Sequence, residues 1–397
     1  MAKKYKIAFL ISHPIQYNSP LFAQMARHPQ INLTVLYCSD ESIKGMQDVG
    51  FGEEIKWDIP LLERHKYKFF KNYSPFPTIF KPPLGLINLN IVNEIRNSSY
   101  DVLIIHGLHY ITHLLAFIVA SFQRTQIFLR MEHPLSQELL KLKWKTLIKK
   151  IIFGQLFKRI SGFFAIGTEN REFYEFYGVR PEKIFLTPYA VDNNRLFKDY
   201  EDFKGKKNEF KKEIGISPDK SVILFVGKLT EKKKPMDLLR AYEKISSTNK
   251  ALVFVGEGSL KEKLANHTIH NNVRDVYFTG FKNQTEISKY YAMADIFVLP
   301  SGIGETWGLV VNEAMCFHLP VVVSDVVGCG KDLIRQGDNG FIFKTGDSDE
   351  LAKYLENLIT SPQQGKIMGE NSFKIIQQWN YKADVDGVIK GLESSNA

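Results

Sequence analysis

The sequence contains few cysteines and no long apolar run. Its 397 residues include three cysteines, Cys38, Cys316 and Cys329, which are far apart and lack metal-ligand spacing. An odd number of distant cysteines argues against a disulfide framework, so we expect a reducing environment. The longest apolar stretch, Ile111 to Phe122, falls well short of the ~20 residues that a membrane-spanning helix needs. We therefore expect a cytoplasmic protein without a transmembrane helix.

The sequence also lacks the patterns of a signal peptide and of a metal site. The start "MAKKYKIAFLISHP" has an apolar run of about six residues, shorter than the ~7–15 of a secretory signal, and is typical of a first strand. The aspartates of "DSD" (Asp347–Asp349) fit a helix N-cap, and Asp384 and Asp386 fall in the terminal helical pattern. We therefore predict no metal ion and no cofactor.

Length and composition are those of a globular protein with two domains. Hydrophobic residues make up 44% of the chain and charged residues 24%, which is ordinary for a folded chain and argues against disorder. A chain of 397 residues is too long for one domain of ~100–200 residues. Short β-rich runs alternate with longer helical patterns, which predicts a doubly wound α/β architecture with parallel sheets.

The β-rich runs divide between two halves of the chain. In the first half we predict strands at Tyr5–Ser12, Ile31–Cys38, Asp101–Gly107, Gln126–Met131, Gly162–Gly167 and Ile184–Pro188. In the second half we predict strands at Ser221–Gly227, Ala251–Gly258, Asp275–Phe281, Asp295–Ser301, Pro320–Asp325 and Gly340–Phe343. Between Ala190 and Lys220 the alternation dissolves into a polar, lysine-rich stretch. We therefore expect an N-terminal domain at 1–200, a C-terminal domain at 201–375, and a terminal helix at 376–397 that crosses back to the N-terminal domain.

The net charge of +9 lies entirely in the first half. Residues 1–200 carry 26 basic and 17 acidic side chains, whereas residues 201–397 carry 26 of each. Residues 137–160 hold seven basic residues and one acid, and helical spacing gathers five apolar residues into one stripe: Leu140, Trp144, Leu147, Ile148 and Ile151. This helix either lies on an anionic membrane surface or faces the core and exposes its lysines. No nucleic-acid-binding motif accompanies the charge, so we expect no nucleic acid partner.

The loop after the strand Ser221–Gly227 is rich in lysine. Gly227 permits a sharp exit from the strand, and Pro235 fits the first turn of a following helix. Between them stand Lys228, Lys232, Lys233 and Lys234. These ammonium groups repel one another unless an anion binds, and a helix N-terminus adds N–H donors. A diphosphate fits this pattern, and a solvated basic loop is the alternative.

Two glutamates, Glu305 and Glu313, lie in "GETWGLVVNEA". We predict a helix that starts near Thr306 or Trp307, which places Glu313 nearly two turns inside it. An anion would dock on the backbone N–H groups between the two glutamates. Each carboxylate could then accept hydrogen bonds from hydroxyls on one side of a diphosphate, which is the layout of a nucleoside diphosphate sugar. Taken singly, either glutamate also fits an N-cap or a surface position.

The sequence resembles the retaining glycosyltransferases of family 4, or glycosyl transferases group 1, over essentially its whole length. The resemblance rests on "VGKL" followed by Lys233 and Lys234, "VGEGSLKEKL", "FTGF", "ADIFVLPS", "ETWGLVVNEA" and "LPVVVSDVVGCGKDLI". It implies a GT-B fold, in which two Rossmann-like domains with parallel sheets face each other across a cleft. It also implies sugar transfer from a nucleoside diphosphate sugar, with a UDP-sugar favoured over a GDP-sugar.

The resemblance assigns roles to residues of the second half. Glu305 would bind the hydroxyls of the donor sugar, and Glu313 would bind those of the ribose. Lys228 and Lys234, or Lys233 in place of Lys234, would neutralise the leaving diphosphate. Backbone groups would line the diphosphate at Thr306, Trp307, Gly308 and Leu309. The base would be lined by Gly280 and Phe281.

The first half departs from the commoner family pattern after its first strand. Many members have glycines there, whereas this chain has "SHPIQYNSPLF", in which Asn18 or Ser19 is placed to cap a helix that Pro20 begins. His13, Gln16 and Tyr17 would then line the cleft.

Relatives carry a histidine near the reacting sugar, and its counterpart in this chain is ambiguous. In "RMEHP" the position aligns with either Glu132 or His133, and in "HGLHYITH" His106 and His109 follow a strand. A histidine that satisfies local backbone groups is the usual alternative for each. We keep Glu132, His133 and His109 as candidates for the reacting centre.

The resemblance implies a retaining, metal-independent reaction. Lysines and helix N–H groups would stabilise the charge on the leaving diphosphate, and a phosphate oxygen would take the proton of the acceptor. The acceptor would be a hydroxyl of a glycan or lipid-linked glycan in cell-surface polysaccharide, lipopolysaccharide or glycolipid synthesis, with attachment to the inner face of the cytoplasmic membrane through residues 137–160. The alternatives are a glycoside hydrolase or phosphorylase, whose carboxylates lie ~5–9.5 Å apart, a nucleotide-sugar epimerase, and a non-enzymatic membrane-surface scaffold.

Overall fold

The structure, a computed structural model, describes residues 3–48, 50 and 52–395. The chain divides into two compact units. Unit 1 comprises Met1–Met46, Ile55–Tyr189 and Tyr381–Ala397, and unit 2 comprises Gln47–Glu54 and Ala190–Asn380. The boundary expected after residue 200 falls inside helix α8 (Asn193–Phe203), and the observed division follows Tyr189.

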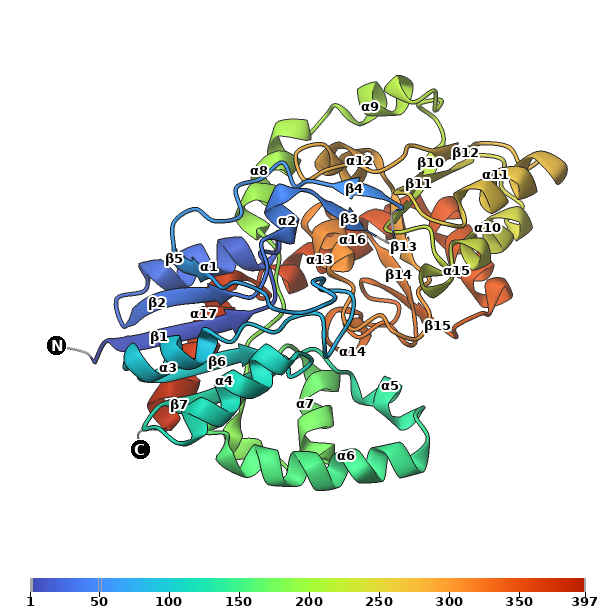
Figure 1. The fold of residues 1–397 in the computed structure, drawn as a ribbon. Helices are drawn as coiled ribbons and strands as arrows, with labels where there is room; N and C mark the ends of the chain where they lie inside the picture. Colours follow the sequence, from blue (N-terminus) through green and yellow to red (C-terminus); the bar gives the residue numbers. More distant parts are fainter. Residues whose placement is uncertain (1–2, 49, 51, 396–397) are drawn as a thin grey trace. The chain divides into compact units, whose positions relative to one another are not determined.

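Unit 1 contains a parallel sheet of seven strands in the order β5-β2-β1-β6-β7-β8-β9 (Figure 1). The strands are β1 Tyr5–Ile11, β2 Ile31–Tyr37, β5 Lys66–Phe69, β6 Val102–His106, β7 Gln126–Met131, β8 Gly162–Ala165 and β9 Ile184–Leu186. Six of them match predicted strands. The exception is β5, whose residues "KYKF" are all exposed at the sheet edge and so lack the buried apolar run that marks the others.

Successive residues of these strands point to opposite faces of the sheet, and helices cover both faces. Leu10, Leu103 and Leu129 share one core with α3 (Ile91–Asn97), α4 (Ile111–Ser121) and α7 (Thr168–Phe176). Phe9, Ile104 and Phe128 share the other core with α1 (Asn18–Arg27) and α17 (Tyr381–Ser394). The sheet is therefore buried on both sides, as a doubly wound fold requires.

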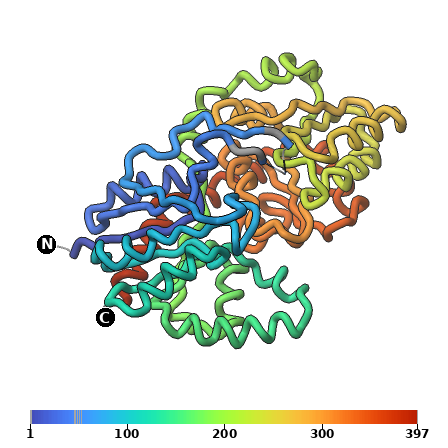
Figure 2. Tube along the Cα trace, in the orientation of Figure 1, coloured from blue at the N-terminus to red at the C-terminus, as the bar shows by residue number. Residues whose placement is uncertain are grey.

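The C-terminal segment of the chain belongs to unit 1. Helix α17 contacts α1, β8 and β9, and Figure 2 shows this red segment beside the blue N-terminal strands. Arg130 of β7 donates two hydrogen bonds to Asp384 of α17, at 3.0 and 2.8 Å, and both side chains are buried. A Cβ at Gly387 would lie 2.0 Å from the carbonyl oxygen of Leu186, so only glycine permits this helix-to-strand approach.

Residues 137–160 form shorter elements than the single helix that the sequence predicted. They are the end of α5 (Leu135–Leu139), then α6 (Lys143–Leu156) and the 3-10 helix η1 (Phe157–Arg159). Within the described part of the chain, no helix combines the length and apolarity that crossing a bilayer requires. The smaller elements of the first half include α2 Glu41–Lys44, the 3-10 helix η2 Pro181–Lys183, β3 Met46–Asp48 and β4 Glu53–Ile55. Strands β3 and β4 form a separate two-stranded sheet.

Unit 2 contains a parallel sheet of six strands in the order β12-β11-β10-β13-β14-β15. All six lie where the sequence predicted strands: β10 Ser221–Val226, β11 Lys250–Val255, β12 Val276–Phe278, β13 Ile296–Leu299, β14 Val321–Ser324 and β15 Gly340–Phe343. Most of the helices of unit 2 alternate with these strands: α10 Pro235–Lys244, α11 Lys261–His270, α12 Ile287–Met293, α13 Leu309–Cys316, α14 Gly330–Leu333, α15 Ser348–Thr360 and α16 Pro362–Ile376.

The polar stretch between Ala190 and Lys220, for which the sequence analysis predicted no element, contains two helices. It forms α8 and α9 (Lys207–Glu213), which bury Leu196 and Phe210. Each helix has too few apolar residues to stand out from its lysines and aspartates. The two parallel sheets confirm the predicted α/β fold class.

Candidate functional site

Each sheet has one point where the strand order reverses. In unit 2 the reversal lies between the neighbouring strands β10 and β13, and in unit 1 it lies between β1 and β6. Ligands of open α/β sheets bind outside the carboxyl ends of the strands at such switch points. In unit 2 the two loops are 227–234 and 300–308, which contain the predicted lysines and Glu305.

These two loops of unit 2 are in contact. The N–H of Gly302 donates to the carbonyl oxygen of Lys232 at 2.7 Å. A Cβ at Gly302 would lie 2.9 Å from Cε of Lys234, so a glycine lets the lysine side chain lie across the loop. Lys234 has a left-handed backbone (φ 48°) and precedes Pro235, which begins α10 as predicted. The fold therefore brings the predicted lysine loop and the Glu305 loop together.

Glu305 lies at the centre of this contact. Its side chain is buried, and one carboxylate oxygen accepts hydrogen bonds from Nζ of Lys233 and from the hydroxyl of Ser301, the latter at 2.9 Å. Burial alone would raise the pKa of Glu305, but the ammonium groups of Lys233 and Lys232 outweigh it and hold the pKa below its usual value. Glu305 is therefore an ionised acceptor in a cationic setting.

Two further lysines of the loop have their own partners. Nζ of Lys228 lies 2.6 and 2.8 Å from the carboxylate oxygens of Asp48, which belongs to the unit 2 segment 47–54. Nζ of Lys234 lies 3.6 Å from the carboxylate of Asp237. Burial lowers the pKa of Lys232, although Glu305 opposes this effect. An anion that binds at Lys228 must therefore compete with Asp48.

The helix after Glu305 begins later than the sequence predicted. Helix α13 starts at Leu309, because Gly308 has a left-handed backbone (φ 96°) and cannot belong to the helix. The expected start near Thr306 or Trp307 is wrong, and Glu313 lies about one turn inside the helix rather than two. Glu313 is buried and accepts a hydrogen bond of 2.7 Å from the hydroxyl of Tyr291.

The backbone before the start of α13 is fixed by packing against neighbouring residues of unit 2. Trp307 is buried, and its indole N–H donates to Asn312 at 2.9 Å while its ring packs on Trp379 at 5.2 Å. A Cβ at Gly328 would lie 2.0 Å from the carbonyl oxygen of Thr306. The buried Trp307 ring thus anchors the loop and does not form a ligand surface. Leu309 is the first residue of α13, and the first backbone N–H groups of a helix have no hydrogen-bond acceptor within that helix.

The loop of the predicted base site adjoins the lysine loop. The N–H of Gly256, after β11, donates to the carbonyl oxygen of Gly280 at 2.9 Å. A Cβ at Gly256 would lie 2.0 Å from the carbonyl oxygen of Gly227, so glycine at position 256 lets the ends of β10 and β11 approach closely. Phe281 follows Gly280 and is partly exposed.

In unit 1, Glu132 lies in a hydrogen-bonded network after β7. Its carboxylate is 2.9 Å from Nε2 of His106 and also bonds Tyr189. Burial would raise the pKa of Glu132, but the bond to His106, the bond to Tyr189 and the charge of Arg130 lower it to about 2. Glu132 is therefore ionised, and the Arg130–Asp384 pair lies next to it.

The other histidines of unit 1 gather at the same edge of the sheet. His109 stacks on His133 with ring centroids 5.3 Å apart. Burial, followed by the charge of His109, lowers the pKa of His133 to about 4. His13 bonds Ser12 at 2.9 Å, and burial with the nearby His106 lowers its pKa to about 4. These histidines are neutral at pH 7.

The three candidates for the reacting centre, Glu132, His133 and His109, thus lie at the carboxyl edge of the unit 1 sheet. Gln16 also lies there, partly exposed after β1. The predicted caps are wrong, because α1 begins at Asn18 and its N-cap is Tyr17 without a capping side chain. Ser19 instead donates to the carbonyl oxygen of Ile15.

Several residues of these sites were not predicted from the sequence. Ser301 and Asp48 contact the predicted Glu305 and Lys228, and Arg130, Asp384 and Tyr189 frame Glu132. Their positions come from strand order and from the return of α17, which no local pattern reveals. Among the described residues, no group of three or more histidines, cysteines or acidic residues is arranged to hold a metal ion.

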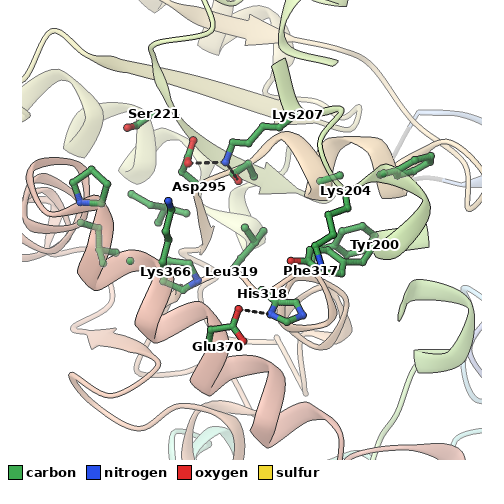
Figure 3. Close-up of a pocket in the computed structure, with 18 of the residues that line it drawn as sticks. Tyr200, Lys204, Lys207, Ser221, Asp295, Phe317, His318, Leu319, Lys366 and Glu370 are labelled. Atoms are coloured by element: carbon green, nitrogen blue, oxygen red, sulfur yellow. Dashed lines mark hydrogen bonds and ion pairs between the residues drawn. The ribbon is translucent and has the colours of Figure 1, made fainter. Parts of the chain in front are cut away.

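A cavity of about 350 Å³ lies at the opposite end of the unit 2 strands (Figure 3). Ser221, Asp295 and Pro320 line it, next to the amino ends of β10, β13 and β14. Lys207 bonds Asp295 at 2.6 Å, and His318 bonds Glu370 at 3.0 Å. None of the predicted site residues lines this cavity. We therefore place the candidate site at the carboxyl ends instead.

Part of the chain matches a known protein family. Residues 206–375 match the family described as glycosyl transferases group 1. The chain is 36% identical over 177 residues to an uncharacterized glycosyltransferase of Methanocaldococcus jannaschii, covering 44% of this chain and 43% of that protein. It spans about half or less of the length of the first curated relatives that it matches.

Solved structures match the whole chain. HepE of Anabaena, in complex with UDP and glucose, has a TM-score of 0.72 at 19% identity, covering 98% of this chain and 99% of that one. The lipopolysaccharide outer core galactosyltransferase WaaB has a TM-score of 0.66 at 18% identity, covering 98% and 99%. The chain therefore has the GT-B fold, and its residues 206–375 match the glycosyl transferases group 1.

Proposed function

We propose that the protein is a glycosyltransferase that moves a sugar from a nucleoside diphosphate sugar to a hydroxyl of a glycan or lipid-linked glycan. The observation that carries the proposal is the buried, ionised Glu305, held by Lys233 and Ser301 at the switch point of unit 2. A carboxylate in that state accepts hydrogen bonds from sugar hydroxyls, and the surrounding lysines attract the phosphates to which the sugar is attached.

The donor binds in three parts. The diphosphate lies against Lys228, Lys233 or Lys234 and the first N–H groups of α13, where a helix N-terminus favours negative charge. Glu305 binds the sugar and Glu313 binds the ribose, while Gly280 and Phe281 line the base. HepE, which shares the fold, was solved with UDP, and this favours a UDP-sugar as the donor.

The reaction retains the anomeric configuration and needs no metal ion. Lysines and N–H groups stabilise the charge that develops on the leaving diphosphate, which is the role of preorganised donors in catalysis. A phosphate oxygen takes the proton of the acceptor hydroxyl on the same face of the sugar. Unit 1 serves the acceptor side, with Glu132, His133 or His109 near the reacting sugar and His13 and Gln16 at the same edge of its sheet.

The acceptor belongs to cell-surface polysaccharide, lipopolysaccharide or glycolipid synthesis. WaaB, whose name describes a lipopolysaccharide galactosyltransferase, supports this assignment through its shared fold. Peripheral attachment to the inner face of the cytoplasmic membrane completes the proposal. It is supported by α6, in which no residue is buried.

Thermal unfolding in the presence of UDP, GDP, ADP and their sugar derivatives tests the donor assignment. A ligand at about 100 times its Kd stabilises the folded state by about 2.7 kcal/mol, so UDP should raise the melting temperature and GDP or ADP should raise it less. The variant Glu305→Gln should keep the response to UDP and lose the additional response to the sugar. Release of nitrophenol from a nitrophenyl glycoside without any nucleotide would instead establish a hydrolase.

A further inference from the structure

Helix α6 exposes an apolar stripe. Spacing of three and four residues places Trp144, Leu147, Ile148 and Ile151 on one face, and each is 48–64% exposed. Three leucines that precede the helix are similarly exposed: Leu139, Leu140 and Leu142. A contiguous apolar surface of this kind is unfavourable in water and marks a binding surface. The alternative of a core-facing stripe is therefore wrong.

The opposite face of α6 is fixed to unit 1. Nζ of Lys149 lies 2.9 Å from the carboxylate of Glu138, whose other contacts are Lys141 at 2.6 Å and Tyr177 at 2.7 Å. Phe153 packs edge-on against Tyr177, with ring centroids 5.0 Å apart. The helix is thus anchored through its inner face, and its exposed stripe is a stable feature of the surface.

Basic residues border the stripe. Lys143, Lys145 and Lys150 are exposed, and α6 contains no acidic residue. The ammonium group of Lys145 lies 5.4 Å from the ring centroid of Trp144, beside the apolar surface. An apolar face with a lysine border complements the interface of a bilayer that contains anionic lipids. At 14 residues the helix is too short to cross a bilayer and would lie along its surface.

A basic cavity of about 290 Å³ adjoins the end of this stripe. Gly154, three residues after Ile151 on the same side of α6, forms part of its wall. The lining contains three cations and no acid: Lys158, Arg180 and Lys183, together with apolar atoms of Phe157, Phe163, Tyr177 and Val179. Lys158 contacts Gln155 at 3.2 Å and Lys183 contacts the carbonyl oxygen of Ile160 at 3.3 Å.

We propose that this cavity and the stripe of α6 together bind an anionic phospholipid of the bilayer. The headgroup phosphate accepts hydrogen bonds from the guanidinium of Arg180 and from Lys158 and Lys183, because planar guanidinium groups bind phosphate oxygens in pairs. The stripe lies at the boundary between headgroups and acyl chains. This inference deepens the proposed membrane attachment by assigning its lipid class and the residues that recognise it.

Sedimentation with vesicles tests the inference on the full chain. Vesicles of phosphatidylcholine alone are compared with vesicles that contain about 30% phosphatidylglycerol, an anionic lipid. Wild-type protein should bind the second kind more tightly. The variant Leu147→Ser with Ile151→Ser should lose binding to both, because it removes the apolar stripe without touching the anchored face.

Two double variants test the cavity. The cavity variant carries Arg180→Gln and Lys183→Gln. The border variant carries Lys143→Gln and Lys145→Gln at the border of the stripe, and it loses the same number of positive charges. Both pairs should weaken binding to the anionic vesicles about 10- to 30-fold at ~0.15 M salt. At ~1 M salt the border variant should match wild-type protein, because exposed charges are then screened, whereas the cavity variant should still bind several-fold more weakly. Equal binding of the two variants at high salt would overturn the headgroup site.

Other outcomes separate this inference from the proposed function. If wild-type protein does not bind vesicles at all, a protein partner or a second copy of the chain covers the stripe, and the lipid inference is wrong. Thermal stabilisation by UDP should be the same in wild-type protein and in all three variants, since unit 2 is unchanged. UDP stabilisation without vesicle binding contradicts the lipid site alone. Vesicle binding without stabilisation by UDP, GDP or ADP contradicts the glycosyltransferase proposal alone.

Discussion

The two switch points share one topology and differ in chemistry. At the reversal in unit 2, glycines allow close backbone approach, and lysines surround the acid Glu305. At the reversal in unit 1, histidines surround the acid Glu132, and a buried pair, Arg130 and Asp384, lies behind it. The first arrangement suits an anionic ligand with polyhydroxyl groups, and the second suits an uncharged hydroxyl. Strand order fixes where a site lies, and side chains decide what it binds.

The largest effect should come from the buried pair of unit 1. Removing one partner of a buried ion pair leaves an uncompensated charge, so Arg130→Met should lower the free energy of unfolding by about 3–5 kcal/mol. Urea unfolding followed by circular dichroism measures this change.

The double variant Arg130→Met with Asp384→Leu is the control for that experiment. It removes both charges and should recover most of the lost stability, because an apolar pair needs no desolvation of ions. A double variant as unstable as the single one would show that packing, not charge, dominates at this position.

The second-largest effect should be a loss of sugar transfer on substitution of Glu305 in unit 2. Glu305→Gln keeps the shape of the side chain and removes its charge, so transfer from the donor should fall about 10²- to 10³-fold, as for other preorganised catalytic contacts. The rate is measured as release of UDP from the UDP-sugar that stabilises the protein best. Full activity of this variant would contradict the role of Glu305.

A smaller effect should follow from losing one lysine. Lys233→Met removes a hydrogen bond to a charged group, worth about 1.5–3 kcal/mol, so UDP should bind about 10- to 100-fold more weakly by calorimetry. Lys263→Met, at an exposed position of α11 in the same unit, is the matched control and should bind UDP like wild-type protein. Equal losses in the two variants would show that general charge, rather than the loop, attracts the nucleotide.

The smallest effect separates the two sites by pH. The pKa values of His13 and His133 are about 4 in the folded state and about 6.5 in the unfolded state. Between about pH 4 and pH 6.5 the unfolded chain binds more protons than the folded chain. These histidines therefore contribute stability that is present above about pH 6.5 and is lost as the pH falls through 4. The pKa of Glu305 is lowered from 4.5, so its site keeps its charge in this window.

Hydrogen exchange reports on both units in the same measurement, which is made once at about pH 7 and once at about pH 5. After correction for the intrinsic rate, peptides from β1 and β7, which precede His13 and His133, should lose protection at the lower pH, and peptides from β10 and β13 should not. The variant His13→Asn with His133→Asn should reduce the difference. An equal loss in both units would contradict the assignment of the pH response to unit 1.

The sequence predicted the central strands well because each is a short, buried apolar run. It missed β5, which is exposed at an edge, and it missed α8 and α9, whose few apolar residues are hidden among charges. The start of α13 was misplaced because the left-handed backbone of Gly308 is set by tertiary packing. Similarly, the contact of Asp48 with Lys228 joins residues 180 positions apart, which no local pattern can reveal.

Exposure of α6 also gives the protein an intrinsic optical reporter. All four tryptophans lie in the described part of the chain; Trp144 is 58% exposed, whereas Trp307 is buried against Trp379 and Trp57 is partly buried. Indole emission shifts to shorter wavelength when the ring leaves water. The arrival of this helix at a lipid surface can therefore be read from the fluorescence of the unlabelled protein, with Trp144→Phe as the silent reference.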